Sequence, residues 1–413
     1  MSRATTCGYL RILAAIVGSC SCVTARSDDS SRSFEIYGFA QVDYIQDSKR
    51  LDSDWEDAFR PSKIAVPEGQ FGVNGAADLS AKQSRIGVEG SMPTTAGASP
   101  IKFKFEIDMF GVGGNAGETA PRLRHAYGEW GALLGGQTHT VFMDIDVYPN
   151  TIDYWGPIGM VFVRNPQVRL TPWRSSDGEA AFAIERPSND VDPGNIRLFE
   201  GFTGAVVRGH EAVPDFTAHY RLGGAWGHLQ LAGLLRRVGY EYQSAPDQAF
   251  NKGSRTGWGA NLSGALKLAG RDRLLLQVDH GDGIATYMND GGMDLAPKNR
   301  IGAAVSSPSP TGVSLQAEAV PLTGVMAYLD HYWTRRWSSS LGYSFVTVDN
   351  TNFQTGDAFH RGDYASINLL MYPADQLVVG AELLWGERTN HDGRSGHDAR
   401  FQFSAKYSFE AVL

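Results

Sequence analysis

The sequence predicts an all-β fold, a sixteen-stranded antiparallel transmembrane β-barrel with a constriction loop folded into it. The first observation is a period of two in hydrophobicity along much of the chain, which is typical of strands. The second is a regular alternation of long and short connections, which is typical of up-and-down barrels in membranes. The third is the composition. Of the 413 residues, 42% are hydrophobic and 20% are charged, and mean hydropathy is −0.25.

This composition excludes several classes of protein. Aromatic residues make up 11% of the chain, which is too many for a disordered protein. After the N-terminus no run of 18 apolar residues occurs, so a helical membrane protein is excluded. A membrane β-barrel is compatible with the mild polarity, because its strands alternate between lipid-facing and lumen-facing residues.

The alternation is clearest in the segments 101–109 and 401–409. In the first, one face carries Ile101, Phe103, Phe105, Ile107 and Met109, and the other carries Lys102, Lys104, Glu106 and Asp108. A strand of a soluble sandwich also alternates in this way, so the number of strands and the spacing of the loops decide the architecture.

Sixteen segments are predicted as strands. They lie near 34–46, 77–91, 100–111, 121–130, 133–138, 163–172, 178–187, 214–222, 226–241, 256–268, 272–281, 323–334, 337–348, 362–372, 376–387 and 398–409. Long connections, such as 47–76 and 139–162, alternate with short ones, such as 131–132. A Greek-key sandwich would not keep this rhythm, and the blade repeat of a propeller is not visible.

The N-terminus resembles an export signal. Arg3 and Arg11 make the first residues positively charged, and the apolar run 12–18 follows them. Small residues up to Ala25 then provide a cleavage site. We therefore predict a signal peptide over 1–25, a short periplasmic segment over 26–33 and the barrel over 34–413. A lipoprotein-type cut with an acylated Cys20 is the alternative. Loss of the two arginines changes the net charge from −8 to −8 − 2 = −10, which speaks against nucleic acid as a partner.

No motif for a cofactor, a metal or catalysis is found, so we expect none of the three. The chain contains no His-Glu-x-x-His, no phosphate-binding loop and no Gly-x-Ser-x-Gly. A β-barrel enzyme such as a lipase would need a Ser or Thr nucleophile beside an outward-facing histidine. His125 and His331 fall on predicted outer faces, but no nucleophile is identifiable beside them. A soluble secreted all-β binding protein is the third possibility, and solubility without detergent would distinguish it.

The predicted inner wall carries a group of cations on neighbouring strands, which we call the basic arc. If Ile86, Val88, Leu123, Tyr127, Val168 and Leu170 face lipid, their polar neighbours face the lumen. The basic arc then consists of Arg85, Lys102, Lys104, Arg122, Arg124 and Arg169. Glu106 and Asp108 also point inward on this pattern and weaken the positive potential.

The segment 139–162 is predicted to fold into the lumen. It is long and unusually aromatic for a solvated loop, and it carries Asp144, Asp146 and Asp153. Folded inward, it would narrow the channel and place these three carboxylates against the basic arc. Opposed charges across a constriction produce a transverse field that filters solutes by charge.

At this point the residues resemble a known family. The segments 37–44, 60–64, 83–88, 122–129, 142–150 and 154–157 are similar to those of DcaP-like outer-membrane porins of Gram-negative bacteria. The resemblance covers residues 35–170 and implies a trimeric porin in the outer-membrane lipid, passing small and often anionic solutes such as dicarboxylates. Two departures are visible. The segment 26–33 is too short for the helical coiled coil of many relatives, and four residues follow Phe409, where an aromatic end is usual.

Overall fold

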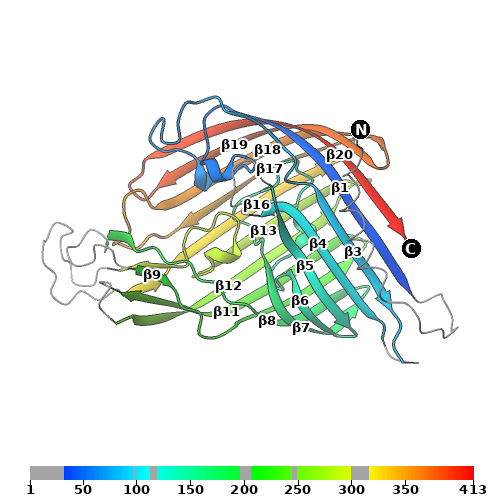
Figure 1. Cartoon of the computed structure of the whole chain (residues 1–413), viewed down its shortest axis with the longest axis horizontal. Helices are drawn as coiled ribbons and strands as arrows, with labels where there is room; N and C mark the ends of the chain where they lie inside the picture. Colours follow the sequence, from blue (N-terminus) through cyan, green and yellow to red (C-terminus); the bar gives the residue numbers. More distant parts are fainter. Residues whose placement is uncertain (1–31, 96–98, 112–118, 196–205, 244–248, 299–315) are drawn as a thin grey trace, which may run out of the picture.

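The alternating segments form strands that pair in chain order, as the computed structural model of the chain shows (Figure 1). The structure describes residues 32–95, 99–111, 119–195, 206–243, 249–298 and 316–413. In these residues eighteen strand segments make one antiparallel sheet, and a separate pair, β14 (Leu295–Pro297) and β15 (Ala317–Ala319), lies outside it. No helix in the described ranges is long and apolar enough to cross a membrane.

The strands of the large sheet have the following bounds. They are β1 (Ser33–Asp47), β2 (Ala77–Ser80), β3 (Arg85–Met92), β4 (Ile101–Gly111), β5 (Ala120–Trp130), β6 (Leu133–His139), β7 (Arg164–Ser175), β8 (Gly178–Glu185), β9 (Val206–Gly209), β10 (Asp215–Gly224), β11 (Gly227–Gln243), β12 (Asn251–Lys267), β13 (Arg273–Asp282), β16 (Pro321–His331), β17 (Trp337–Val348), β18 (Phe359–Ala374), β19 (Leu377–Asn390) and β20 (Ser395–Val412).

These segments make a sixteen-stranded wall among the described residues, as the alternation predicts. β2 and β3 both pair with β1, so they are two parts of one interrupted strand. β9 and β10 both pair with β11 and likewise form one strand. The predicted fold class is therefore confirmed, although β9 was not predicted and β12 begins at Asn251, closer to the loop end than the alternation indicated.

The sheet closes because its last strand pairs with its first. β20 runs antiparallel to β1, from the pair Glu35 and Val412 to the pair Asp47 and Arg400. Residues 410–412, which follow Phe409, therefore still belong to the last strand. Closure pairs the edges of the first and last strands, and a closed sheet is the form in which strands can cross a bilayer.

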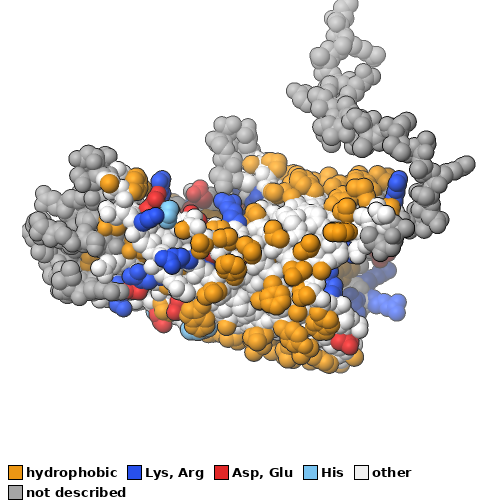
Figure 2. All heavy atoms as spheres, turned by 90° about the horizontal axis from the view of Figure 1, so that it is seen from below, with side chains coloured by type: hydrophobic (Ala, Val, Ile, Leu, Met, Phe, Trp, Pro, Cys, Tyr) orange, Lys and Arg blue, Asp and Glu red, His pale blue; other side chains and the backbone are white. Residues whose placement is uncertain are grey.

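The outer surface of the wall is apolar. Outward side chains such as Phe105 and Leu231 are 47% and 60% exposed. Figure 2 shows the hydrophobic side chains spread over most of one face, with charged side chains gathered toward its two ends. This distribution fits a barrel whose middle lies in hydrocarbon.

A β-bulge between β4 and β5 corrects two predictions. The register changes between the pairs Glu106–His125 and Ile107–Leu123, so Arg124 is an extra residue on β5. A bulge of this kind shifts the phase of the in–out alternation by one residue. His125 is therefore buried inside and bonded to Thr138 at 3.0 Å. Tyr127 is opposite Lys104 and shares its inward face. The predictions that His125 and Tyr127 face outward are wrong.

Candidate functional site

The connection between β6 and β7 folds into the barrel. Its side chains Phe142 and Ile158 have no exposed surface, and the Phe142 ring packs edge-on against Tyr287 with centroids 6.1 Å apart. A short 3-10 helix in it, η4 (Ile145–Val147), contacts β12 and β13 on the inner wall. The predicted inward fold of residues 139–162 is thus confirmed, and we call this segment the constriction loop.

The inner wall has a glycine where the backbone of the constriction loop packs directly against it. A Cβ atom on Gly324 of β16 would lie 2.0 Å from the Gly159 carbonyl oxygen, so only glycine fits there. The Gly159 N–H donates to the Asn289 carbonyl at 2.9 Å, and the Asn289 N–H donates to the Met160 carbonyl at 2.9 Å. The constriction loop is therefore paired with the connection that follows β13, which also lies in the lumen.

An arginine from a third loop contacts both the constriction loop and the connection that follows β13. Arg60, from the connection between β1 and β2, places its guanidinium 3.9 Å from the centre of the Trp55 ring and 4.0 Å from that of Trp155. The same guanidinium pairs with Asp290 at 2.7 Å. The Arg60 guanidinium thus contacts two indole faces and a buried carboxylate, and these contacts join the loops that carry them. We call this arrangement the Arg60 clasp. Three loops from distant parts of the sequence thus hold each other in the lumen.

Asp153 anchors the constriction loop. Its carboxylate is 2% exposed and accepts hydrogen bonds at 3.0 Å from the N–H groups of Phe59, Trp155 and Gly156. Burial raises the pKa of this carboxyl above its ordinary value. Its own N–H donates at 2.7 Å to the buried carboxylate of Glu382 on β19. Asp153 is therefore part of the attachment of the loop to the wall.

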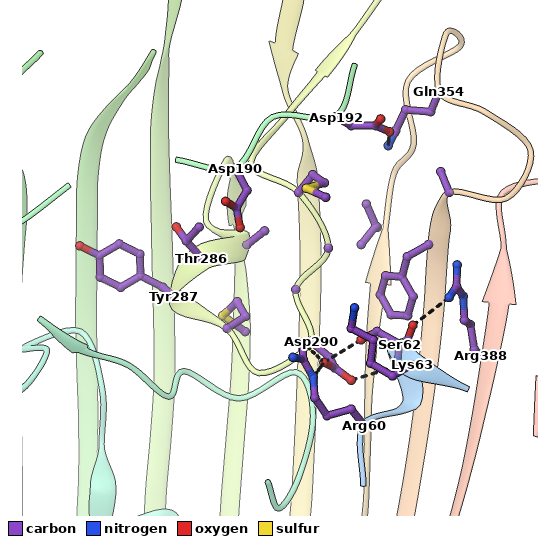
Figure 3. A pocket seen from close by; sticks show the side chains of 18 of the residues that line it. Arg60, Ser62, Lys63, Asp190, Asp192, Thr286, Tyr287, Asp290, Gln354 and Arg388 are labelled. Atoms are coloured by element: carbon purple, nitrogen blue, oxygen red, sulfur yellow. Dashed lines mark hydrogen bonds and ion pairs between the residues drawn. The ribbon is translucent and has the colours of Figure 1, made fainter. Parts of the chain in front are cut away.

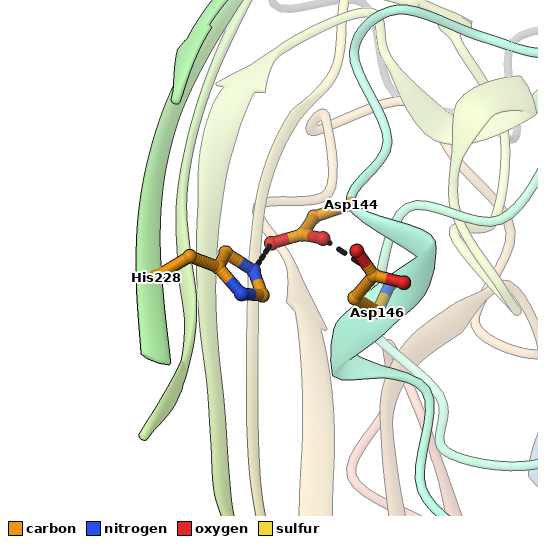
Figure 4. Close-up of side chains that lie close together, drawn as sticks. All are labelled: Asp144, Asp146 and His228. Atoms are coloured by element: carbon orange, nitrogen blue, oxygen red, sulfur yellow. Dashed lines mark hydrogen bonds and ion pairs between the residues drawn. The ribbon is translucent and has the colours of Figure 1, made fainter. Parts of the chain in front are cut away.

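Asp144 and Asp146 lie against the opposite wall (Figure 4). Asp144 accepts hydrogen bonds from His228 Nε2 at 2.7 Å and from the Ser263 hydroxyl at 2.9 Å. Burial would raise the pKa of Asp144, but His228, Arg221 and Ser263 together outweigh it and lower the pKa. Asp146 pairs with Arg221. The predicted position against the basic arc is therefore wrong for Asp144 and Asp146.

Asp144, Asp146 and His228 form the one group in the described ranges whose ligand atoms could jointly hold a metal ion, since these atoms lie within 4.8 Å of one another. Arg221 already supplies a positive charge there, 3.7 Å from Asp144 and in contact with Asp146. The donor set is thus satisfied by protein cations, and it does not resemble a cation site awaiting an ion.

The basic arc faces carboxylates of its own wall. Arg124 bonds Glu106 at 2.6 Å and Asp108 at 3.0 Å, and Arg122 bonds Asp108 at 2.6 Å. Arg85 lies 3.6 Å from Glu106. The β-bulge and the strand register therefore place Glu106 and Asp108 within the basic arc.

The remaining members of the basic arc lie nearer the short-turn end. Lys104 pairs with Glu89 at 2.7 Å. Lys102 is exposed, and neither Lys102 nor Arg169 has an ion pair within the described part of the chain. The six predicted cations thus divide into two sets. Arg85, Arg122 and Arg124 form a compact set, which we call the arginine group, and the other three lie nearer the short-turn end of the barrel.

The constriction loop meets this arginine group with an aromatic side chain. The Tyr154 hydroxyl accepts a hydrogen bond from Arg122, and the Arg122 guanidinium is 5.2 Å from the centre of the Tyr154 ring. Tyr154 is also stacked on Phe110, with centroids 3.8 Å apart. The loop therefore contributes an aromatic surface to this side of the channel.

A cavity of about 370 Å³ lies between the constriction loop and the wall. Its charged lining consists of three cations and one carboxylate, namely Arg85, Arg124, Lys406 and Asp153. Lys406 was on the predicted polar face of the last strand but was not assigned to the arc. Closure of the barrel brings it beside Arg85, since both cations lie over the Phe39 ring, at 5.3 and 5.1 Å.

Arg164 is a further cation that the sequence did not indicate. It is the first residue of β7, where strand alternation is not yet established. Its charge interacts with that of Arg124, and one of its terminal nitrogens has no hydrogen-bond partner among the described residues. No local pattern in the sequence could have identified it.

Comparisons with known proteins agree with this architecture. A model of the family described as "DcaP outer membrane protein" matches residues 30–302. The crystal structure of the outer membrane channel DcaP of Acinetobacter baumannii is similar, with a TM-score of 0.74 and 22% identity, over 94% of this chain and 100% of that one. No curated protein matches the sequence.

More distant solved structures share the fold. An anion-selective porin from Comamonas acidovorans has a TM-score of 0.57 and 9% identity, over 92% of this chain and 100% of that one. OmpT of Vibrio cholerae has a TM-score of 0.54 and 11% identity, over 93% of this chain and 99% of that one. At such identities the likeness concerns the fold alone.

Proposed function

Because the chain belongs to the DcaP outer membrane protein family, and is thus an outer-membrane channel rather than an enzyme, we propose that it passes small hydrophilic anions by passive diffusion. Dicarboxylates are the class of solute proposed. We further propose that it assembles as a homotrimer and is exported by the signal peptide at residues 1–25, which lie outside the described part of the chain.

One observation carries the proposed selectivity. The cavity beside the constriction loop is lined by Arg85, Arg124 and Lys406, and by the single carboxylate of Asp153. That carboxylate is buried and accepts hydrogen bonds from three backbone N–H groups. The charged side chains that line this cavity are thus three cations and one hydrogen-bonded carboxylate, a balance that favours a negatively charged solute.

The carboxylates within the basic arc reduce this preference without reversing it. Glu106 and Asp108 are shared among Arg85, Arg122 and Arg124. Arg164 and Lys406 add two positive charges, and no carboxylate among the described residues forms an ion pair with either. The local balance is therefore positive, although the whole chain has a net charge of −8. Charges on the outer loops act weakly here, because they are screened within about 10 Å at 0.1 M salt.

Flux into liposomes tests this proposal. Purified protein is reconstituted, and entry of succinate, of an uncharged polyol and of a diamine of similar size is compared by swelling rate. We expect succinate to enter fastest and the diamine slowest, because only the dianion is attracted by the arginine group. Equal rates, or faster entry of the diamine, would contradict the proposed anion preference.

A further inference from the structure

A second cavity lies on the other side of the constriction loop, toward the long loops. Its volume is about 690 Å³, and it is lined by residues from the connections that follow β1, β8, β13 and β17 and by Arg388 of β19. Trp155 of the constriction loop forms part of its lining. A solute that enters from the loop end therefore occupies this cavity, which we call the vestibule, before it reaches the basic arc.

Two carboxylates form one side of the vestibule (Figure 3). Asp190 is exposed to the cavity, and within the described residues its carboxylate has no hydrogen-bond or ion-pair partner. Asp192 is held by the Gly194 N–H at 2.7 Å and by the Gln354 amide at 2.9 Å, both neutral groups. The backbone of Asp190 is itself fixed, because its N–H donates to Asp294 at 3.0 Å. Both negative charges are therefore held in place, and Asp190 is the one whose oxygens remain available to a solute, because Asp192 is buried.

Three cations lie on the other side together with Asp290, and Asp357, which contacts Arg388, also lines the cavity. Figure 3 shows Lys63, Arg60 and Arg388 grouped away from Asp190 and Asp192. Arg60 is committed to Asp290 at 2.7 Å, whereas Lys63 has only a long contact of 3.8 Å with Asp52. Each Arg388 nitrogen donates to a neutral oxygen at 2.8 to 2.9 Å. These acceptors are the backbone carbonyls of Ser62 and Asp357 and the side-chain amide oxygen of Asn390. Lys63 is thus the cation that is freest to bind a solute.

The lining of the vestibule also includes apolar side chains, alongside polar ones such as Asn165 and Thr286. Val163, Met288, Met293, Val348 and Phe359 contribute to the lining. A cube of 690 Å³ is roughly 9 Å wide, and an extended peptide reaches at most about 3.5 Å per residue. A chain of two or three residues therefore spans the vestibule, with one terminus near each charged side and its side chains over the apolar lining.

We propose that the vestibule is a binding site for short zwitterionic peptides of two or three residues. The peptide ammonium group binds Asp190, where the buried Asp192 adds to the negative potential, and the peptide carboxylate binds Lys63. A simple anion finds a partner only in the lysine, and a simple cation only in the carboxylate, so a solute with both charges binds more tightly than either. This site goes beyond the anion preference proposed for the constriction and does not depend on it.

Current block in single-channel recordings tests the site. Trialanine is added to one side of the bilayer and then to the other, and the apparent Kd is taken from the concentration dependence of block. N-acetyl-trialanine and trialanine amide serve as analogues that each lack one charge. We expect trialanine to block from the loop side with a Kd at least about tenfold lower than that of either analogue, since each loses a charge-assisted hydrogen bond.

Three variants assign the block to the named residues. Asp190→Asn and Lys63→Gln should each raise the Kd for trialanine by about tenfold. Asp54→Asn removes an exposed loop carboxylate that does not line the vestibule, and it should change the Kd less than twofold. Asp190 is exposed, so its substitution leaves the barrel intact, which the heat-dependent migration of the folded protein on gels checks.

Two results would overturn the proposal. One is equal block by trialanine and its two analogues, and the other is an unchanged Kd in both Asp190→Asn and Lys63→Gln. The reversal potential in a KCl gradient reports the constriction separately. Failure of the peptide site is therefore distinguishable from failure of the anion preference.

Discussion

Adjacent residues on one strand experience opposite environments, and this permits a direct test of the membrane assignment. Phe105 is 47% exposed on the outer face, whereas Lys104 lies inside and pairs with Glu89. We predict that Phe105→Arg costs about 2–4 kcal/mol of folding free energy near the bilayer midplane. Lys104→Ala should cost far less, because it removes one partly exposed ion pair.

Urea unfolding of the protein in lipid vesicles measures both effects. Phe103→Arg, on the same face of β4, is the matched variant and should behave as Phe105→Arg does. A greater loss of stability in Lys104→Ala than in Phe105→Arg would show that the strand is turned the other way or that the wall is not in lipid.

The arginine group permits a second residue-scale test. Replacement of Arg122 and Arg124 by Ala removes two cations and leaves Asp108 without either of the partners that now bond it. The reversal potential in a KCl gradient should therefore shift toward the potassium potential. Arg394→Ala removes a cation that pairs with Asp392 on an exposed loop, and it should leave the potential unchanged. An unshifted double variant that retains a folded barrel would remove these arginines from the selectivity filter.

Alternation along single strands was enough to place most of the basic arc on the inner wall. Alternation could not show which carboxylates form ion pairs with the basic arc. The partner of Arg124 depends on a bulge in β5, and a bulge is set by pairing with β4, which leaves no local mark in the sequence. Asp153 is fixed by Glu382 and by the Phe59 N–H, and these partners are more than 90 residues away in the chain.

At the scale of elements, the constriction loop is the part that sets the width of the channel. It is held by β19, by the connection after β13 and by the Arg60 clasp. We predict that deletion of residues 146–155 raises single-channel conductance, because this segment occupies the lumen and lines the cavity beside the arginine group.

The control for this deletion removes residues 66–75, which are ten largely exposed residues of the connection between β1 and β2. That change should leave conductance close to the value of the intact protein. If removal of residues 146–155 also leaves it unchanged in a folded barrel, the current does not pass beside this loop.

The elements themselves were largely readable from the sequence, and the loop contacts were not. A wall strand alternates because lipid and lumen impose different solvents on its two faces, and this pressure acts on every second residue. The long aromatic segment 139–162 was recognisable as an inward loop for the same reason, because its composition does not suit water. Its direction across the lumen depends on Gly324 and Asn289, which lie in other parts of the chain.

For the whole molecule, closure of the barrel decides which residues share the channel. Pairing of β20 with β1 brings Lys406 beside Arg85, although the two are far apart in the sequence. Closure also separates the charge of the lumen from that of the exterior. The chain carries 45 acidic and 37 basic residues among Asp, Glu, Lys and Arg, but an ion in the constriction responds to the side chains within about one Debye length.

The central claim is that the constriction prefers anions despite this net negative charge. Its most direct test is the reversal potential of the unaltered protein in a planar bilayer that separates two KCl concentrations. We predict a reversal potential displaced from zero toward the chloride equilibrium potential. The reason is the excess of cations in the constriction, namely Arg85, Arg122, Arg124, Arg164 and Lys406 against Glu106 and Asp108. A potential on the potassium side would contradict the assignment of this arginine group as the selectivity filter.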